Sequence, residues 1–239
     1  MRPILSCLLT SLPLVAAAAT PPAGAPARLR LEHEGVEVIY PADRAQTLAA
    51  PSNWLQELQA AGVYASAPLR LDPGGGAGAL VLACDSGPSA DPSCYLLRDA
   101  DRPEVRVFEA PGTRFEFRGD GRILVSGHSA NLYDHRRLYT YDGTRFVETP
   151  QPLRYVGVEA RARVPIALHA ERDGAGAVTL TLPAGAAFTV LLNDNSRIDE
   201  RGENPNYLVR TADGIVGWVL LPSHPDGSTD AEGLFFRGD

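Results

Sequence analysis

The sequence predicts a mainly β protein, in which an N-terminal β-rich domain with one short helix is followed by a small β-barrel. Two observations lead to this fold class. Short runs of β-branched and aromatic residues recur along most of the 239-residue chain, and turns rich in Asp, Gly and Pro separate them. A single clear helix candidate, residues 52–61, carries apolar side chains at helical spacing between capping residues.

Residues 1–19 have the organisation of a secretory signal peptide. Arg2 supplies the positive charge, residues 4–15 form a short apolar region, and Ala16 to Ala19 offer small residues for cleavage. A tripeptide similar to a lipobox precedes Cys7, but six residues leave no room for an apolar region before it. We therefore place Cys7 inside the signal peptide and leave its lipidation open.

The rest of the chain has no apolar run near the roughly 20 residues that a membrane span needs. We therefore expect a periplasmic or secreted protein without stable membrane insertion. The 29 acidic residues exceed the 22 basic ones, and the formal net charge is −7. This balance argues against nucleic acid as a partner, because an acidic protein gains little from displacing counterions.

Two cysteines, Cys84 and Cys94, lie beyond the signal peptide at the two ends of one polar loop. In an oxidising compartment this arrangement predicts a disulfide. The alternatives are a metal pair and a redox pair. Both are disfavoured, because nine residues separate the cysteines and no His lies between them.

The N-terminal domain is expected to cover residues 28–150, after a Pro- and Ala-rich linker at residues 20–27. A hairpin is predicted over residues 29–39, turning at Glu34-Gly35. In the helix of residues 52–61 one face carries apolar side chains, and Gly62 is placed to end it. Nine further strands are predicted at residues 69–71, 79–83, 94–97, 105–109, 115–117, 123–126, 138–141, 146–148 and 155–160.

Within this series Asp120-Gly121 and Asp142-Gly143 are both hairpin signals. The segment Leu138–Val147 resembles the closing hairpin of periplasmic β-meander domains, which include some lysozyme inhibitors. Pro150-Gln151-Pro152 then marks the expected domain boundary.

The C-terminal part contains a strand pair around Asp213-Gly214, which ends in Gly217-Trp218-Val219. A Pro-Gly turn at residues 183–185 feeds another strand. Together these features resemble the bacterial SH3-like domain, a small β-barrel of exported envelope proteins. The resemblance implies a barrel over residues 155–222, with residues 223–239 as a loosely ordered tail.

In SH3-like domains, loops and exposed aromatic residues carry binding when it occurs. The resemblance therefore implies binding candidates in the polar insertion of residues 193–206 and on the aromatic residues beside it. These candidates are Asn193, Asp194, Asn195, Tyr207 and Trp218. Trp218 has the alternative of a core position, since Trp is usually largely buried. The first expected barrel strand, residues 163–168, departs from the family pattern.

A polar cluster at residues 126–135 is the one place where a nucleophile, a base and an acid could meet. It includes His128, Asp134 and His135, but it lacks the Gly-x-Ser-x-Gly turn. We interpret it as a polar loop between strands and predict no catalytic residue, no metal site and no cofactor. The glycines of residues 74–78 are interpreted as a flexible turn, because no Gly-Lys-Ser/Thr sequence follows them.

These observations favour an exported, non-catalytic binding protein of the bacterial envelope that contacts peptidoglycan or an envelope protein. A periplasmic inhibitor or immunity-type protein directed at a cell-wall-degrading enzyme is the alternative. A hydrolase is the distant third.

Overall fold

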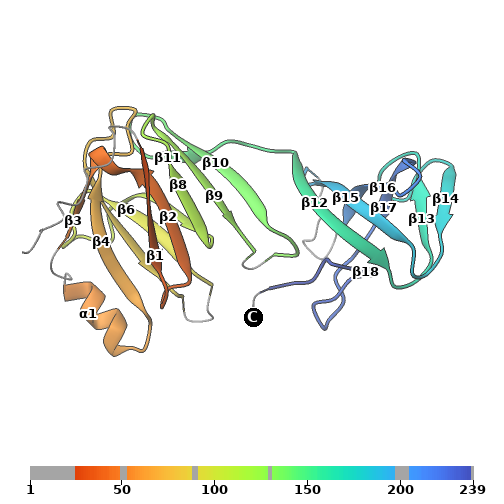
Figure 1. Ribbon diagram of the computed structural model, residues 1–239, viewed down its shortest axis with the longest axis horizontal. Coiled ribbons are helices and arrows are strands. Elements are labelled where there is room, and N and C mark those ends of the chain that lie inside the picture. The colour runs from red at the N-terminus through yellow and green to blue at the C-terminus, as the bar shows by residue number, and fades with distance from the viewer. Residues whose placement is uncertain (1–24, 49–52, 88–90, 129–130, 197–204, 238–239) are drawn as a thin grey trace, which may run out of the picture.

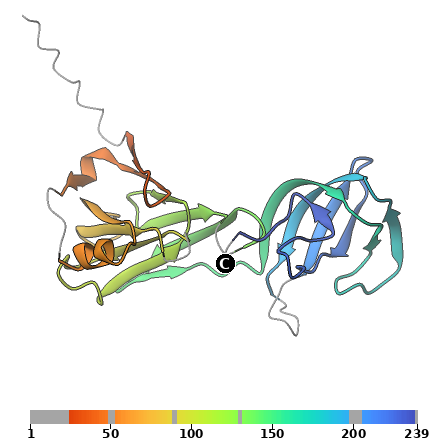
Figure 2. The ribbon, with the colours of Figure 1, turned by 90° about the horizontal axis from the view of Figure 1, so that it is seen from below.

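The computed structural model describes residues 25–48, 53–87, 91–128, 131–196 and 205–237. It confirms a mainly β fold with one short α-helix. Two β-rich units lie next to each other along the long axis, as Figures 1 and 2 show. The predicted signal peptide, with Cys7 inside it, lies outside the described residues.

The N-terminal unit contains two sheets. The first has the order β1 (Pro26–Leu31), β2 (Val36–Pro41), β8 (Arg114–Phe117), β9 (Arg122–Gly127), β10 (His135–Tyr141) and β11 (Phe146–Glu148). The second has the order β3 (Ala45–Thr47), β4 (Ala65–Leu71), β5 (Leu80–Asp85), β6 (Ser93–Leu97) and β7 (Arg106–Pro111). A short 3₁₀ turn, η1 (Ala42–Arg44), precedes β3. Neighbouring strands are antiparallel in both sheets, except for the parallel pair β2 and β8.

Apolar side chains of the two sheets share one core. The ring of Phe108 on β7 meets three rings of the first sheet edge-on, those of Phe115, Tyr139 and Phe146. Such edge-to-face pairs stabilise a core beyond the area that they bury. The predicted hairpins of this unit are confirmed by the pairs β1–β2, β8–β9 and β10–β11.

Strand β5 is buried along its whole length. Leu80, Leu82 and Cys84 join the core between the sheets, whereas Val81 and Ala83 belong to a second cluster on the outer face. Burial on both faces explains why this strand is a continuous apolar run. Its neighbour β6 supplies Cys94, and the predicted Cys84–Cys94 disulfide is confirmed.

The single helix α1 (Asn53–Ala60) agrees with the predicted segment to within one residue at each end. Leu55 is fully buried, and the indole nitrogen of Trp54 donates a 2.8 Å hydrogen bond to the carbonyl of Ala100. At the C-terminus, Val63 N donates to the carbonyl of Leu58, with Gly62 at φ +84° between them. This is the left-handed ending that Gly62 predicted.

The glycine-rich turn after β4 is packed against another turn. The amide of Gly121, in the β8–β9 turn, donates to the carbonyl of Pro73 at 2.8 Å. A Cβ atom on Gly74 would lie 2.1 Å from the carbonyl oxygen of Gly119. The glycines therefore permit a close approach of two backbones, a role beyond that of a turn.

The C-terminal unit is one sheet of seven strands. Their order is β14 (Val178–Leu182), β13 (Ile166–His169), β17 (Val216–Leu220), β16 (Asn206–Thr211), β15 (Ala187–Asp194), β12 (Leu153–Ala162) and β18 (Ala231–Glu232). The hairpin predicted at Asp213-Gly214 is confirmed by the pair β16–β17. In the described residues β14 and β18 are the two ends of the sheet, so the expected barrel is not closed.

Two expectations about the ends of the units are wrong. The expected linker reaches residue 27, but strand β1 already begins at Pro26 and pairs with β2. The expected loosely ordered tail contains strand β18, which pairs with β12, and the fully buried side chain of Leu234. The Pro- and Ala-rich composition continues through Pro26 and Ala27, and β18 has only two residues, so neither segment shows a strand pattern of its own in the sequence.

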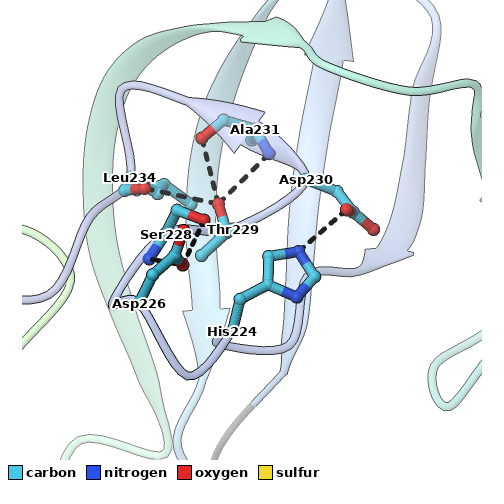
Figure 3. A network of polar contacts seen from close by, with 7 residues as sticks. All are labelled: His224, Asp226, Ser228, Thr229, Asp230, Ala231 and Leu234. Atoms are coloured by element: carbon cyan, nitrogen blue, oxygen red, sulfur yellow. Dashed lines mark hydrogen bonds and ion pairs between the residues drawn. The ribbon is translucent and has the colours of Figure 1, made fainter.

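The tail is held by a polar network of its own, drawn in Figure 3. The hydroxyl of Thr229 accepts from the amide of Ala231 at 3.1 Å and donates to its carbonyl at 3.0 Å. His224 contacts Asp230 at 3.0 Å. Because the Thr229 side chain is fully buried, these bonds satisfy groups that water cannot reach.

No helix in the described ranges is both long enough and apolar enough to cross a membrane.

Candidate functional site

Two of the predicted binding residues meet at the junction between the units. Asn193 on β15 and Tyr207 on β16 are cross-strand partners. Tyr133, which precedes β10, donates from its hydroxyl to Oδ1 of Asn193 at 3.1 Å and packs edge-on against Tyr207. All three side chains are buried, with Tyr207 only 2% exposed. The structure thus places Asn193 and Tyr207 inside the protein, away from the exposed loop that the sequence suggested.

His135 lies on the other side of Tyr133. Its Nδ1 is 3.0 Å from the guanidinium of Arg154, and its ring stacks at a tilt on Tyr133. Since Arg can only donate, the imidazole accepts at Nδ1 and carries its proton on Nε2. Burial, followed by the charges of Arg154 and Arg137, lowers the pKa of His135 from 6.5 to about 3.

Arg154 extends this chain of contacts to the first sheet. It forms a 3.5 Å ion pair with Glu148, which in turn accepts a 3.0 Å hydrogen bond from the hydroxyl of Tyr139. Burial is the main reason why the pKa of Tyr139 is raised to about 12. Neutral His135 and charged Arg154 therefore bind one unit to the other.

The arrangement gives no support to a catalytic relay in the 126–135 cluster. Asp134 is exposed, and the nitrogen of His135 that would need a carboxylate faces Arg154. His128 contacts the carbonyl of Phe235 at 2.9 Å. The interpretation as a polar loop between strands is corrected in part, because His135 is the first residue of β10 and is half-buried. Residues 129–130 lie outside the described residues.

Asp194 and Trp218 meet through Arg172. The guanidinium of Arg172 pairs with Oδ2 of the fully buried Asp194 at 3.0 Å and lies 4.7 Å from the ring centre of Trp218. Trp218 is half-buried, so it is neither a fully buried core residue nor a fully exposed aromatic surface for a ligand. Asn195 is half-buried too, and its amide donates to the carbonyl of Pro152 at 2.8 Å. Residues 197–204 of the insertion lie outside the described residues.

A different place offers an accessible hollow. A cavity of about 510 Å³ opens where the β1–β2 turn meets the segment that joins α1 to β4. Its lining includes His33, Glu34, Gln59, Val63, Tyr64 and Ser66. Both segments lie at the same end of the N-terminal unit, close to α1 in Figure 1.

Aromatic rings form one wall of this cavity. The imidazole of His33 is stacked on the phenol ring of Tyr64, with centroids 5.1 Å apart and planes inclined by 20°. Tyr64 remains 57% exposed despite the stacking. An exposed ring that is already held in a fixed orientation presents a flat π-face to a ligand, and binding then costs little side-chain entropy.

Glu34 supplies a carboxylate to the same cavity. It is the one buried residue of the turn 32–35, and 8% of its surface is exposed. In the part of the chain that the structure describes, no hydrogen bond or ion pair engages its carboxylate. Nearby, the amide nitrogen of Gln59 is occupied by the carbonyl of Ala65 at 2.8 Å. The cavity therefore combines an aromatic face with an uncommitted, largely buried acceptor.

Sequence reasoning did not select these residues. His33 and Glu34 belong to a hairpin turn, and Tyr64 follows them at a distance of about thirty positions without any motif that connects them. A glutamate at the tip of a hairpin is ordinarily solvated, so only its burial beneath the second segment reveals its position.

Over the described ranges, no three His, Cys, Asp or Glu side chains gather in a way that could hold a metal ion.

Comparison with protein-family models, with curated proteins and with solved structures finds no match to this chain.

Proposed function

We propose that this chain is an exported, non-catalytic binding protein of the bacterial envelope, and that the His33–Tyr64 cavity is its binding site. One observation carries the proposal. A concave site with an exposed aromatic face and a largely buried carboxylate that has no internal partner is typical of a site that holds a ligand. The sequence prediction of a signal peptide and the Cys84–Cys94 disulfide support export.

Binding to the cell wall is the first expectation to test. The purified protein is mixed with insoluble peptidoglycan and sedimented, and the bound fraction is measured. We expect the wild type to sediment and Tyr64→Ala to lose most of the binding, because the exposed ring is the flat surface of the site. Tyr155→Ala is the matched control, since that tyrosine is 53% exposed but lies on β12 of the other unit.

The same protein should also be used to capture partners from an envelope extract. Recovery of a wall-degrading enzyme, lost in Tyr64→Ala and kept in Tyr155→Ala, would favour the inhibitor function over peptidoglycan binding. Retention of neither peptidoglycan nor any envelope protein would contradict the proposal as a whole.

A further inference from the structure

We infer that the His33–Tyr64 cavity binds a primary ammonium group, held by the carboxylate of Glu34 against the face of Tyr64. This inference rests on the proposed binding function, because it names the chemical group that the proposed site would hold.

Glu34 brings a negative charge to the cavity. A carboxylate withdrawn from water is costly unless a cation or several hydrogen-bond donors compensate it. Glu34 is largely buried and none of the described residues pairs with it, and the cavity lining contains no Arg. The carboxylate oxygens of Glu34 are not among the side-chain atoms that water cannot reach, so water solvates them in the free protein. A cation in the cavity would replace that water with a charge-assisted hydrogen bond.

The cavity lining offers hydrogen-bond acceptors to a ligand. Glu34 has two uncommitted oxygens, and Gln59 uses its amide nitrogen for the carbonyl of Ala65, which leaves its Oε1 available. An ammonium group carries three donors and no acceptor, so it matches this lining. A phosphate or a carboxylate ligand would meet the like charge of Glu34.

The ring of Tyr64 forms the aromatic wall of the cavity. A cation placed over a tyrosine face is attracted by the ring's negative π-surface. His33 stacks on Tyr64 and so fixes the ring beside the turn that carries Glu34. One ammonium group at the mouth of the cavity can therefore contact the ring and the carboxylate together, with its alkyl chain along Val63.

The test uses n-pentylammonium as the probe and follows the backbone amides of the purified protein by NMR titration. n-Pentanol, which has the same alkyl chain without the charge, is the matched probe. We expect n-pentylammonium to shift amides of residues 32–35 and 62–66, and n-pentanol to bind at least about tenfold more weakly, as expected for loss of a charge-assisted bond. Equal binding of the two probes would contradict the inference.

Variants then separate the two contacts. Glu34→Gln keeps the shape but removes the charge, and should weaken n-pentylammonium binding by about tenfold or more. Tyr64→Ala should weaken it by about three- to fivefold, as expected for an exposed cation–π contact. Glu32→Gln is the control, because it removes the same charge from an exposed position of the same turn. It should change binding by less than about twofold.

The outcomes also distinguish this inference from the proposed function. If Glu34→Gln binds n-pentylammonium as the wild type does, the ammonium inference is wrong, whereas peptidoglycan sedimentation still tests the proposed function. If n-pentylammonium binds as expected and the protein retains neither peptidoglycan nor an envelope protein, the ammonium inference is supported and the proposed envelope function is contradicted.

Discussion

At the scale of single residues, the environment of His135 strongly changes its acid–base chemistry. A half-buried imidazole that accepts a bond from Arg154 is kept neutral, and its pKa of about 3 makes it a poor proton acceptor at neutral pH. The junction thus uses His135 as a hydrogen-bond acceptor.

This lowered pKa predicts a pH-dependent stability. Between the unfolded pKa of 6.5 and the folded pKa of about 3, the unfolded chain binds a proton at His135 that the folded chain does not. Stability should therefore fall as the pH drops from 6.5, by up to about 3 kcal/mol at pH 4. His135→Gln retains an acceptor for Arg154 and should remove this part of the slope. Urea unfolding at pH 7 and pH 4 measures it, and parallel slopes for the two proteins would contradict the prediction.

Gly74 is a second residue with a specific structural role. Gly74→Ala places a methyl group against the backbone of Gly119, so we expect a loss of roughly 2–4 kcal/mol in the free energy of unfolding. Gly76→Ala is the matched control, because Gly76 has a similar positive φ with open space around it. It should cost about 1 kcal/mol from the backbone conformation alone. Equal losses for the two variants in thermal unfolding would show that the close approach is unimportant.

At the scale of elements, the C-terminal tail behaves as a part of the fold. Strand β18 is the edge strand at one end of the C-terminal sheet. Beyond β18, the amide of Arg237 donates a hydrogen bond to the carbonyl of Asn131 at 3.0 Å. Since Asn131 precedes β10, the tail runs from the C-terminal sheet back to the N-terminal unit. The described part of the tail accordingly runs from β18 toward the N-terminal unit in Figures 1 and 2.

Leu234 anchors this tail. Leu234→Ala removes a fully buried side chain and should lower the free energy of unfolding by about 2–5 kcal/mol. Phe235→Ala changes the next residue, which is 45% exposed, and should cost distinctly less. Chemical denaturation of the two variants makes the comparison. A loosely ordered tail would instead give two small and similar effects.

At the scale of the whole molecule, the two units share the residues at their junction. Tyr133 belongs to the connection before β10, yet it is part of the core cluster of the C-terminal sheet. Conversely, Arg154 on β12 of the C-terminal unit contacts His135 and Glu148 of the first sheet. The junction is therefore built of both apolar and polar contacts.

Tyr133→Ala tests this coupling. It deletes a buried ring and leaves Asn193 without the Tyr133 hydroxyl, so we expect a loss of about 3–5 kcal/mol in the free energy of unfolding. Tyr64→Ala, at an exposed tyrosine, should change it by less than about 1 kcal/mol. Denaturant unfolding followed by circular dichroism measures both. A Tyr133→Ala protein as stable as the Tyr64→Ala protein would show that the units are joined without this contact.

The sequence by itself determined the features that depend on neighbouring residues. Alternating apolar residues around Glu34-Gly35, Asp120-Gly121 and Asp213-Gly214 specified hairpins, because strand period and turn conformation are both local properties. The same holds for the helix that ends at Gly62 and for the Cys84–Cys94 pair, whose two strands are joined by one loop.

Only the tertiary structure decided the pairings between distant segments. The parallel pair β2–β8 brings Glu37 to Arg114, 77 residues along the chain. Burial of Asn193 and Tyr207 depends on Tyr133, and the cavity exists because the turn at Glu34 meets Tyr64. Residues 193 and 207 carry polar groups that local rules assign to the surface. Their burial depends on partners that no local pattern specifies, and so the candidate site emerged only from the folded chain.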